Sequence, residues 1–187
     1  MKYVKIVFSP TGGTAKVADI LTKKWTGVEQ IDLSKADTNY SEYKFEPEDN
    51  VLIAMPSFGR LAPEVAINRL KKISGNGAKC TIVCVYGNRA YEDTLAQMED
   101  AAKECGFEVI AAVAAIAEHS IIHKYATNRP DAADEKQLED FAEQISNKEG
   151  AVTFVPGNRP YKKSGGAGLV PKVTGNCVKC GLCASNC

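Results

Sequence analysis

The stretch Ser9-Pro10-Thr11-Gly12-Gly13-Thr14 decides how the rest of the chain is interpreted. It follows the apolar run Tyr3-Val4-Lys5-Ile6-Val7-Phe8 and precedes a helical pattern that begins near Ala15. A strand, a turn rich in glycines and hydroxyl groups, and then a helix form an arrangement that holds phosphate. The first N–H groups of the helix lack partners within it, and the helix dipole favours an anion there. We therefore predict a phosphate-binding loop, and the simpler alternative is a turn that only caps the first helix.

Two kinds of group in this loop suit a phosphate. Gly12 and Gly13 let the backbone approach the anion closely and adopt positive φ where needed. Three side chains can donate hydroxyl hydrogen bonds, namely Ser9, Thr11 and Thr14. The Gly-Lys-Ser/Thr ending of nucleoside-triphosphate loops and the G-x-G-x-x-G pattern of dinucleotide loops are both absent.

Composition and charge narrow the class of protein. The chain has 187 residues, 44% of them hydrophobic and 25% charged, which predicts one ordinary globular domain with an appendage. It has no apolar run long enough for a membrane span and no signal peptide, so we expect a cytoplasmic protein without a membrane partner. All 23 acidic residues lie within positions 1–150, whereas positions 151–187 hold five basic residues. Because five scattered basic residues are a weak signal, we do not expect nucleic acid as a partner.

Apolar runs alternate with amphipathic segments along positions 1–150. The runs expected to form strands are 3–8, 28–33, 51–56, 80–86 and 107–116. Such alternation predicts a doubly wound α/β domain, with a five-stranded parallel sheet and helices on both faces. In the strand order 2-1-3-4-5, ligands lie beyond the carboxyl ends of strands one, three and four. Positions 151–175 contain many Gly and Pro residues and are expected to form an irregular linker or arm.

The loops after the third and fourth predicted strands suit a planar heteroaromatic ring. They read Ser57-Phe58-Gly59-Arg60-Leu61-Ala62-Pro63 and Tyr86-Gly87-Asn88-Arg89-Ala90-Tyr91-Glu92-Asp93. Aromatic side chains can stack on the faces of such a ring, and backbone groups can bond to its polar edge. The alternative is that Phe58 and Tyr91 are half-buried hydrophobic residues of ordinary loops.

The phosphate loop resembles that of flavodoxins. The segments Tyr86-Gly87-Asn88-Arg89-Ala90-Tyr91-Glu92-Asp93 and Glu118-His119-Ser120-Ile121 resemble the flavodoxin-like half of bacterial and archaeal flavodoxin–ferredoxin fusions. The resemblance covers about the first 125 residues and implies a flavodoxin-like fold that binds FMN. It assigns the phosphate to Ser9, Thr11, Gly12, Gly13 and Thr14. It assigns the ring to Ser57, Phe58, Gly59, Arg60, Tyr86, Gly87, Asn88, Arg89 and Tyr91. For His119 we favour a structural role as a polar cap over a place beside the flavin.

Four cysteines at positions 176–187 have the C-x2-C-x2-C-x3-C spacing of bacterial ferredoxins. They are Cys177, Cys180, Cys183 and Cys187. This spacing favours a [4Fe–4S] cluster over zinc, whose sites more often use two separated C-x-x-C pairs, and over disulfides. In two-cluster ferredoxins the fourth cysteine ligates the other cluster and is followed by proline. Since neither that proline nor a second run is present, we expect no intact cluster in the chain as written.

The function expected from these features is electron transfer by an FMN protein. In the complete protein, iron–sulfur clusters would exchange single electrons with the flavin, and other redox proteins would be the partners. Flavodoxins are usually acidic around the flavin, whereas Arg60 and Arg89 lie in the two ring loops here, so we expect a less destabilised hydroquinone. The alternatives are an FMN-dependent NAD(P)H or quinone reductase and a binding module that uses the basic tail.

Overall fold

The computed structural model describes residues 1–148, 150–162 and 172–185. Its sheet consists of β1 (Tyr3–Val7), β2 (Glu29–Asp32), β3 (Asn50–Pro56), β4 (Lys79–Tyr86) and β5 (Glu108–Ile116). All neighbouring strands pair in parallel, in the order β2-β1-β3-β4-β5. The predicted doubly wound α/β fold and its strand order are therefore confirmed.

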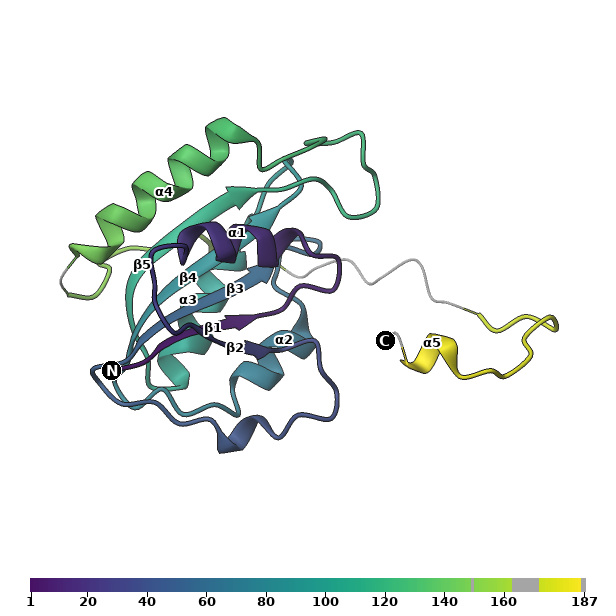
Figure 1. The fold of residues 1–187 in the computed structure, drawn as a ribbon, viewed down its shortest axis with the longest axis horizontal. Coiled ribbons are helices and arrows are strands. Elements are labelled where there is room, and N and C mark those ends of the chain that lie inside the picture. The colour runs from purple at the N-terminus through teal and green to yellow at the C-terminus, as the bar shows by residue number, and fades with distance from the viewer. Residues whose placement is uncertain (149, 163–171, 186–187) are drawn as a thin grey trace.

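Helices cover both faces of this sheet (Figure 1). They are α1 (Gly13–Leu21), α2 (Glu64–Leu70), α3 (Thr94–Glu104) and α4 (Ala132–Ser146), with a 3-10 turn η1 (Tyr40–Glu42) and a short α5 (Leu182–Ser185). On one face, α1 and α4 enclose a core that includes Val17 and Leu138. On the other face, α2 and α3 enclose a core that includes Leu70 and Met98. Among the described residues, no helix combines the length and the apolar character needed to cross a membrane.

Burial along the strands follows their position in the sheet. The central strands β3 and β4 are buried at nearly every residue, as strands covered on both faces must be. The edge strand β2 has only four residues, and Glu29 and Gln30 at its start are exposed. A short, polar edge strand resists pairing with another chain.

Helix α1 is shorter than its apolar pattern predicts. The helical spacing of Val17, Leu21 and Trp25 in the sequence predicts a helix that reaches Trp25, but α1 ends at Leu21. The N–H of Trp25 closes a turn onto the carbonyl of Thr22 (2.9 Å), and the indole packs against Tyr3 with ring centroids 5.1 Å apart. We attribute the early end to this tertiary contact, together with the weak helix propensity of the threonines and glycine nearby. The amino-terminal part of the sheet is consequently not covered by α1.

The segment 151–162 is irregular, as expected of the arm, and it packs on α3. Val152 donates its N–H to the carbonyl of Val109 (2.8 Å), and the Val155 side chain is buried in the core. Gly157 adopts a φ of +141°, and a Cβ there would lie 2.4 Å from that of Ala96. Only glycine permits so close an approach. The proposed boundary at residue 150 stays a prediction.

One carboxylate binds this arm to the ring loops. Asp93 is completely buried, and its Oδ1 accepts hydrogen bonds from the N–H (2.8 Å) and the side-chain amide (2.7 Å) of Asn158. Its Oδ2 accepts from the N–H of Lys162 (2.8 Å). These N–H donors, from Asn158 first and then Lys162, hold the pKa of Asp93 below its usual range. Nearby, Arg159 pairs with Glu99 (2.6 Å) and Asp100 (2.9 Å).

Candidate functional site

A cavity of about 290 Å³ lies where β1, β3, β4 and β5 end. It is lined by Thr11, Gly13 and Thr14, and by residues 56–59, 85–87 and 117–121. The carboxyl ends of parallel strands on either side of the switch in strand order form such a crevice. Strand β5 therefore contributes to this cavity, in addition to β1, β3 and β4, the three strands that the topological rule predicted.

The loop after β1 is held open by its first residue. Ser9 accepts the N–H of Ala15 on its Oγ (3.0 Å) and the N–H of Gly12 on its carbonyl (3.4 Å). Gly12 has a φ of +88°, a left-handed conformation that side chains resist. Ser9 and Gly12 therefore shape the loop from outside the cavity lining.

Three backbone donors of this loop remain free. Within the described residues, the N–H groups of Thr11, Gly13 and Thr14 have no hydrogen-bond partner. Thr14 is only 5% exposed, and its hydroxyl also has no partner among the described residues. The first N–H groups of a helix have no partner within it, and here they lie beside the cavity with the Thr14 hydroxyl, so together they can bind an anion there. The positive end of the α1 dipole adds to the attraction for an anion.

The nearest cation does not serve this loop. Lys16 directs its Nζ to the carbonyl of Pro130 (2.7 Å) and lies 3.8 Å from the carboxylate of Glu135. It thereby ties α1 to the start of α4. An anion in the cavity would be held by neutral N–H and hydroxyl groups.

The loop after β3 is a tight turn that exposes an aromatic ring. The N–H of Phe58 bonds to the carbonyl of Leu61 (2.8 Å), and Gly59 and Arg60 between them have φ values of +61° and +94°. Phe58 is 46% exposed although it lines the cavity. The left-handed backbone at a non-glycine residue such as Arg60 is strained, and strain of this kind is concentrated at functional sites.

The loop after β4 passes close to the loop after β5. A Cβ on Gly87 would lie 2.6 Å from Cδ2 of His119, so only glycine fits. The His119 Nδ1 accepts the N–H groups of Ile121 (3.2 Å) and Ile122 (3.1 Å). These bonds give His119 a capping role, but its ring also lines the cavity, so the structure does not separate the polar cap from a place beside a ligand. Because Nδ1 is an acceptor, the neutral imidazole carries its proton on Nε2.

The segment after β5 is rigidified by its own polar groups. Glu118 accepts the N–H of Asn128 (2.7 Å) and contacts Nδ1 of His123 (2.7 Å). These bonds, from Asn128 first, hold the pKa of Glu118 below its usual range. The cavity wall formed by residues 117–121 is thus braced from behind.

The two arginines of the ring loops share one carboxylate. Arg60 Nε lies 3.1 Å from Glu92 Oε2, and Arg89 Nη2 lies 3.0 Å from Oε1. The first contact is an ion pair whose angle does not make a hydrogen bond, so Oε2 is buried without a hydrogen-bond donor. Glu92 therefore offsets much of the positive charge that the sequence assigned to these loops.

The structure brings together part of the predicted ring and phosphate site. The predicted residues that line the cavity are Thr11, Gly13, Thr14, Ser57, Phe58, Gly59, Tyr86 and Gly87. Those outside the lining are Ser9, Gly12, Arg60, Asn88, Arg89 and Tyr91. Tyr91 instead packs edge-on against Tyr86, with ring centroids 5.4 Å apart. Ser57 Oγ joins the loops by donating to the carbonyl of Tyr91 (3.4 Å). The cofactor assignments themselves stay predictions.

Sequence reasoning named the segment 118–121 only through a resemblance and did not place it in the site. The missed lining residues are Pro56, Val85, Ala117, Glu118, Ser120 and Ile121. The available signal was topological, because β5 ends at the same edge of the sheet as β1, β3 and β4.

The cysteines form two groups with different surroundings. Cys80 and Cys84 are completely buried in β4, and burial raises the pKa of both thiols, that of Cys84 to about 12. Cys177, Cys180 and Cys183 are exposed, while Cys187 lies outside the described residues. No three His, Cys, Asp or Glu side chains in the described part of the chain come together as a metal site. The assignment of these cysteines as cluster ligands stays a prediction.

Solved structures with a similar fold include flavodoxins. The flavodoxin of Streptococcus pneumoniae TIGR4 is 21% identical, with a TM-score of 0.53 over 77% of this chain and 97% of its own. The Fusobacterium nucleatum flavodoxin bound to flavin mononucleotide is 15% identical, with a TM-score of 0.53 over 78% and 98%. A short-chain flavodoxin associated with a bacterial microcompartment is 18% identical, with a TM-score of 0.54 over 78% and 97%. The fold of this chain is flavodoxin-like.

No protein-family model and no curated protein matches the sequence.

Proposed function

We propose that this chain is an electron-transfer flavoprotein that binds FMN at the carboxyl end of its sheet. The observation that carries the proposal is the group of unpaired donors at Thr11, Gly13 and Thr14 beside the cavity. A phosphate monoester offers the acceptors that these donors lack. The flavodoxin-like fold supports the choice of FMN, since one of the similar flavodoxins is bound to it.

The residues around the cavity also fit a flavin ring. Exposed Phe58 offers an aromatic face, and Gly59 and Gly87 line the cavity without side chains of their own. The Nε2–H of His119 is a donor in the same wall. When bound, FMN supplies one- and two-electron chemistry, while the protein supplies binding and orientation and tunes the potential.

The chain's own charges would tune the bound flavin moderately. Glu92 holds Arg60 and Arg89 outside the cavity lining and neutralises one of the two positive charges. One positive charge therefore remains beside the ring loops. It would stabilise the reduced flavin less than two unpaired arginines would.

We further propose that the four terminal cysteines contribute to iron–sulfur clusters in the complete protein. The support is the ferredoxin-type spacing of Cys177, Cys180, Cys183 and Cys187. The exposure of the first three leaves them accessible for ligation. Single electrons would pass between such a cluster and the flavin, and other redox proteins of the cytoplasm would be the partners.

The test is an absorption spectrum of the chain purified without oxygen, followed by extraction of any cofactor and titration of the FMN-free chain with FMN. We expect oxidised-flavin bands, FMN in the extract and one saturable site. A chain that neither retains FMN nor binds it on titration would contradict the proposal. Steady turnover of NAD(P)H or a quinone by the purified chain would instead identify a reductase.

Two variants of α1 test the phosphate loop within this experiment. Thr14→Val removes a hydroxyl that has no hydrogen-bond partner among the described residues, so we expect unchanged stability and about tenfold weaker FMN binding. Thr22→Val is the matched control, because Thr22 is also buried but bonds to the carbonyl of Ala18 (2.8 Å) at the far end of the helix. Equal FMN affinity in both variants would remove Thr14 from the site.

A further inference from the structure

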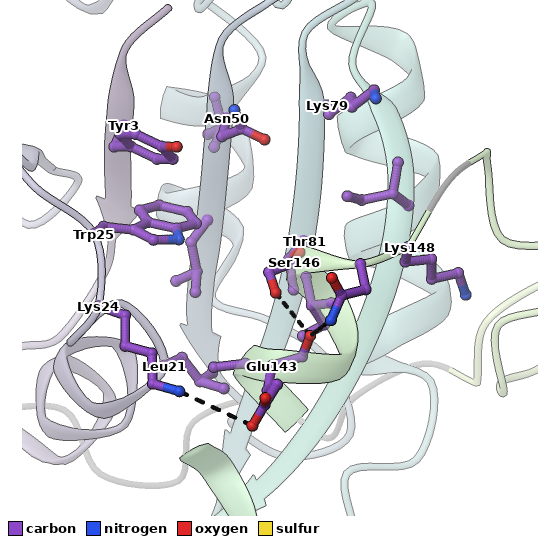
Figure 2. A pocket seen from close by; sticks show the side chains of 16 residues that line it. Tyr3, Leu21, Lys24, Trp25, Asn50, Lys79, Thr81, Glu143, Ser146 and Lys148 are labelled. Carbon is purple, nitrogen blue, oxygen red and sulfur yellow. Dashed lines mark hydrogen bonds and ion pairs between the residues drawn. The ribbon is translucent and has the colours of Figure 1, made fainter. Parts of the chain in front are cut away.

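A second and larger cavity, of about 480 Å³, lies at the amino-terminal end of the sheet (Figure 2). It opens on the face that α1 and α4 cover, and it exists because α1 ends at Leu21 and leaves this part of the strands without a helix above them. Nothing in the proposed electron-transfer function uses it. Its volume is within the range of cavities that bind small organic ligands.

Apolar side chains form part of the lining of this cavity, beside polar ones such as Asn50 and Ser146. Leu52, on the α1/α4 face of β3, and Ile110 contribute apolar side chains to the floor, and Trp25 and Ile145 contribute to the walls. The lining residues come from β1, β3, β4 and β5, so the floor crosses three interstrand spacings, or about 14 Å. A ligand that covers this floor must be elongated and largely apolar.

One polar group on the floor has no partner. Thr81 is only 3% exposed, and its hydroxyl makes no hydrogen bond to any described residue. Among the described residues, Glu92 Oε2 is the fully buried side-chain oxygen without a partner, so the Thr81 hydroxyl is open to the cavity, where a ligand oxygen can bond to it. The apolar floor therefore contains one point for a hydrogen bond.

The rim of the cavity carries excess positive charge. Among the described lining residues, three are lysines and one is a carboxylate, that of Glu143, which lies 3.9 Å from Lys24. Lys79 and Lys148 have no ion-pair partner among the described residues, although Glu108 is the neighbour of Lys79 in the sheet. In Figure 2 both lysines lie across the cavity from Tyr3 and Trp25, and away from the pair of Lys24 and Glu143.

We propose that this cavity binds an amphipathic anion, namely a medium-chain carboxylate. The carboxylate lies between Lys79 and Lys148, and the hydrocarbon chain extends over Leu52 toward Trp25. The positive rim favours a ligand with a negative charge, and the extent of the floor favours a hydrocarbon chain of medium length. This proposal is independent of FMN binding, because the two cavities share no lining residue.

The test uses the fluorescence of Trp25, which is the only tryptophan of the chain and lines the cavity. The whole purified chain is titrated with decanoate below its micelle concentration, with and without FMN. We expect a saturable change in Trp25 emission at both FMN conditions and no change in the molecular mass of the protein. Decyltrimethylammonium, which has the same chain and the opposite charge, should bind at least tenfold more weakly.

Two lysine variants locate the anionic head. Lys79→Gln/Lys148→Gln should weaken decanoate binding about tenfold, whereas Lys136→Gln, an exposed lysine of α4 outside the cavity, should change it less than twofold. The proposal is overturned if decanoate gives no saturable signal, if the cationic ligand binds equally well, or if the double variant keeps full affinity. A signal that depends on protein concentration alone would show that a second copy of the chain occupies the cavity, and would overturn it as well.

Discussion

The two cavities lie at opposite ends of one sheet, and each offers a different part of the chain to a ligand. At the carboxyl end, backbone N–H groups around Gly12 and Gly13 are the donors, and their positions are set by backbone conformation. At the amino end, the charges are on the long side chains of Lys79 and Lys148, above a floor of strand residues. The first site depends on glycines and rigid loops, whereas the second depends on individual side chains. The same kind of substitution should therefore have different effects at the two ends.

The largest effect is expected from Gly87→Ala at the carboxyl end. The new Cβ would lie 2.6 Å from the His119 ring and displace it from the N–H groups of Ile121 and Ile122. Overpacking of this kind costs about 1–3 kcal/mol, so FMN affinity should fall by as much as about a hundredfold in titration. Gly13→Ala is the control, because its Cβ would lie an ordinary 3.5 Å from that of Ala117. Equal losses in both variants would show that the loops are less rigid than described.

The next effect concerns the arm that braces the carboxyl end. Asp93→Ala leaves the N–H groups of Asn158 and Lys162 without their acceptor, and we expect the thermal midpoint to fall by about 6 °C. Decanoate binding at the amino end should be unchanged. The exposed helix cap Asp131→Ala should cost about half as much. A midpoint equal to that of the wild type would mean that the arm does not contribute to stability.

The same contact predicts a pH dependence. Hydrogen bonds from Asn158 and Lys162 lower the pKa of Asp93 in the folded protein. In Asp100, burial raises the pKa, but the hydrogen bonds from Arg159 and Tyr161 outweigh burial, so the pKa of Asp100 is lowered as well. A lowered folded pKa gives stability that is complete above the unfolded value of about 4 and is lost as the pH falls through the folded value. Urea midpoints should therefore be level above about pH 5 and decline below pH 4. Asp93→Ala should flatten that decline.

A smaller effect is expected from Glu92→Gln, which releases both arginines of the ring loops. The loss of one negative charge beside Arg60 and Arg89 should raise the midpoint potential of bound FMN by about 10–40 mV, since partly exposed ion pairs contribute less than about 1 kcal/mol. A redox titration measures this shift. Arg69→Gln, on α2, is the control and should leave the potential unchanged. A potential that falls in Glu92→Gln would reverse our assignment of Glu92 as the neutralising group.

The smallest effect is expected from combining the two ligands. The two sites share no residue and are joined only through the packed sheet, so saturating decanoate should change FMN affinity less than about twofold. Titration of FMN with and without decanoate measures the coupling. A tenfold change in FMN affinity on adding decanoate would show that the two sites are coupled, and would contradict their independence.

The two ends also differ in how far the sequence predicted them. The carboxyl end followed from alternating elements and one topological rule, which placed the loops at Thr11–Thr14, Phe58 and Gly87 along one edge. The opposing Glu92 was missed because its pairing with Arg60 and Arg89 depends on backbone φ values of +45° and +94° that local patterns do not specify.

The amino end was not predicted at all. Its cavity exists because the contact between Trp25 and Tyr3 replaces a last turn of α1, and the apolar spacing favoured the helix. Tertiary contacts override helix propensity in such cases. The attachment of 151–162 was missed for a similar reason, since the acceptor of its N–H groups, Asp93, is about 65 residues away in the sequence.

The attachment of the arm at Lys162 also limits how far the cysteines that follow it can lie from the carboxyl end of the sheet. Lys162 is held at the ring loops by Asp93, and the first ferredoxin-type cysteine, Cys177, follows 15 positions later. A chain of that length spans at most about 50 Å, whatever its conformation. Any redox group held by Cys177, Cys180 and Cys183 is therefore present around the carboxyl end at millimolar effective concentration, independent of how dilute the protein is. Exchange between the two centres would follow first-order kinetics, whereas exchange with a separate ferredoxin would depend on its concentration.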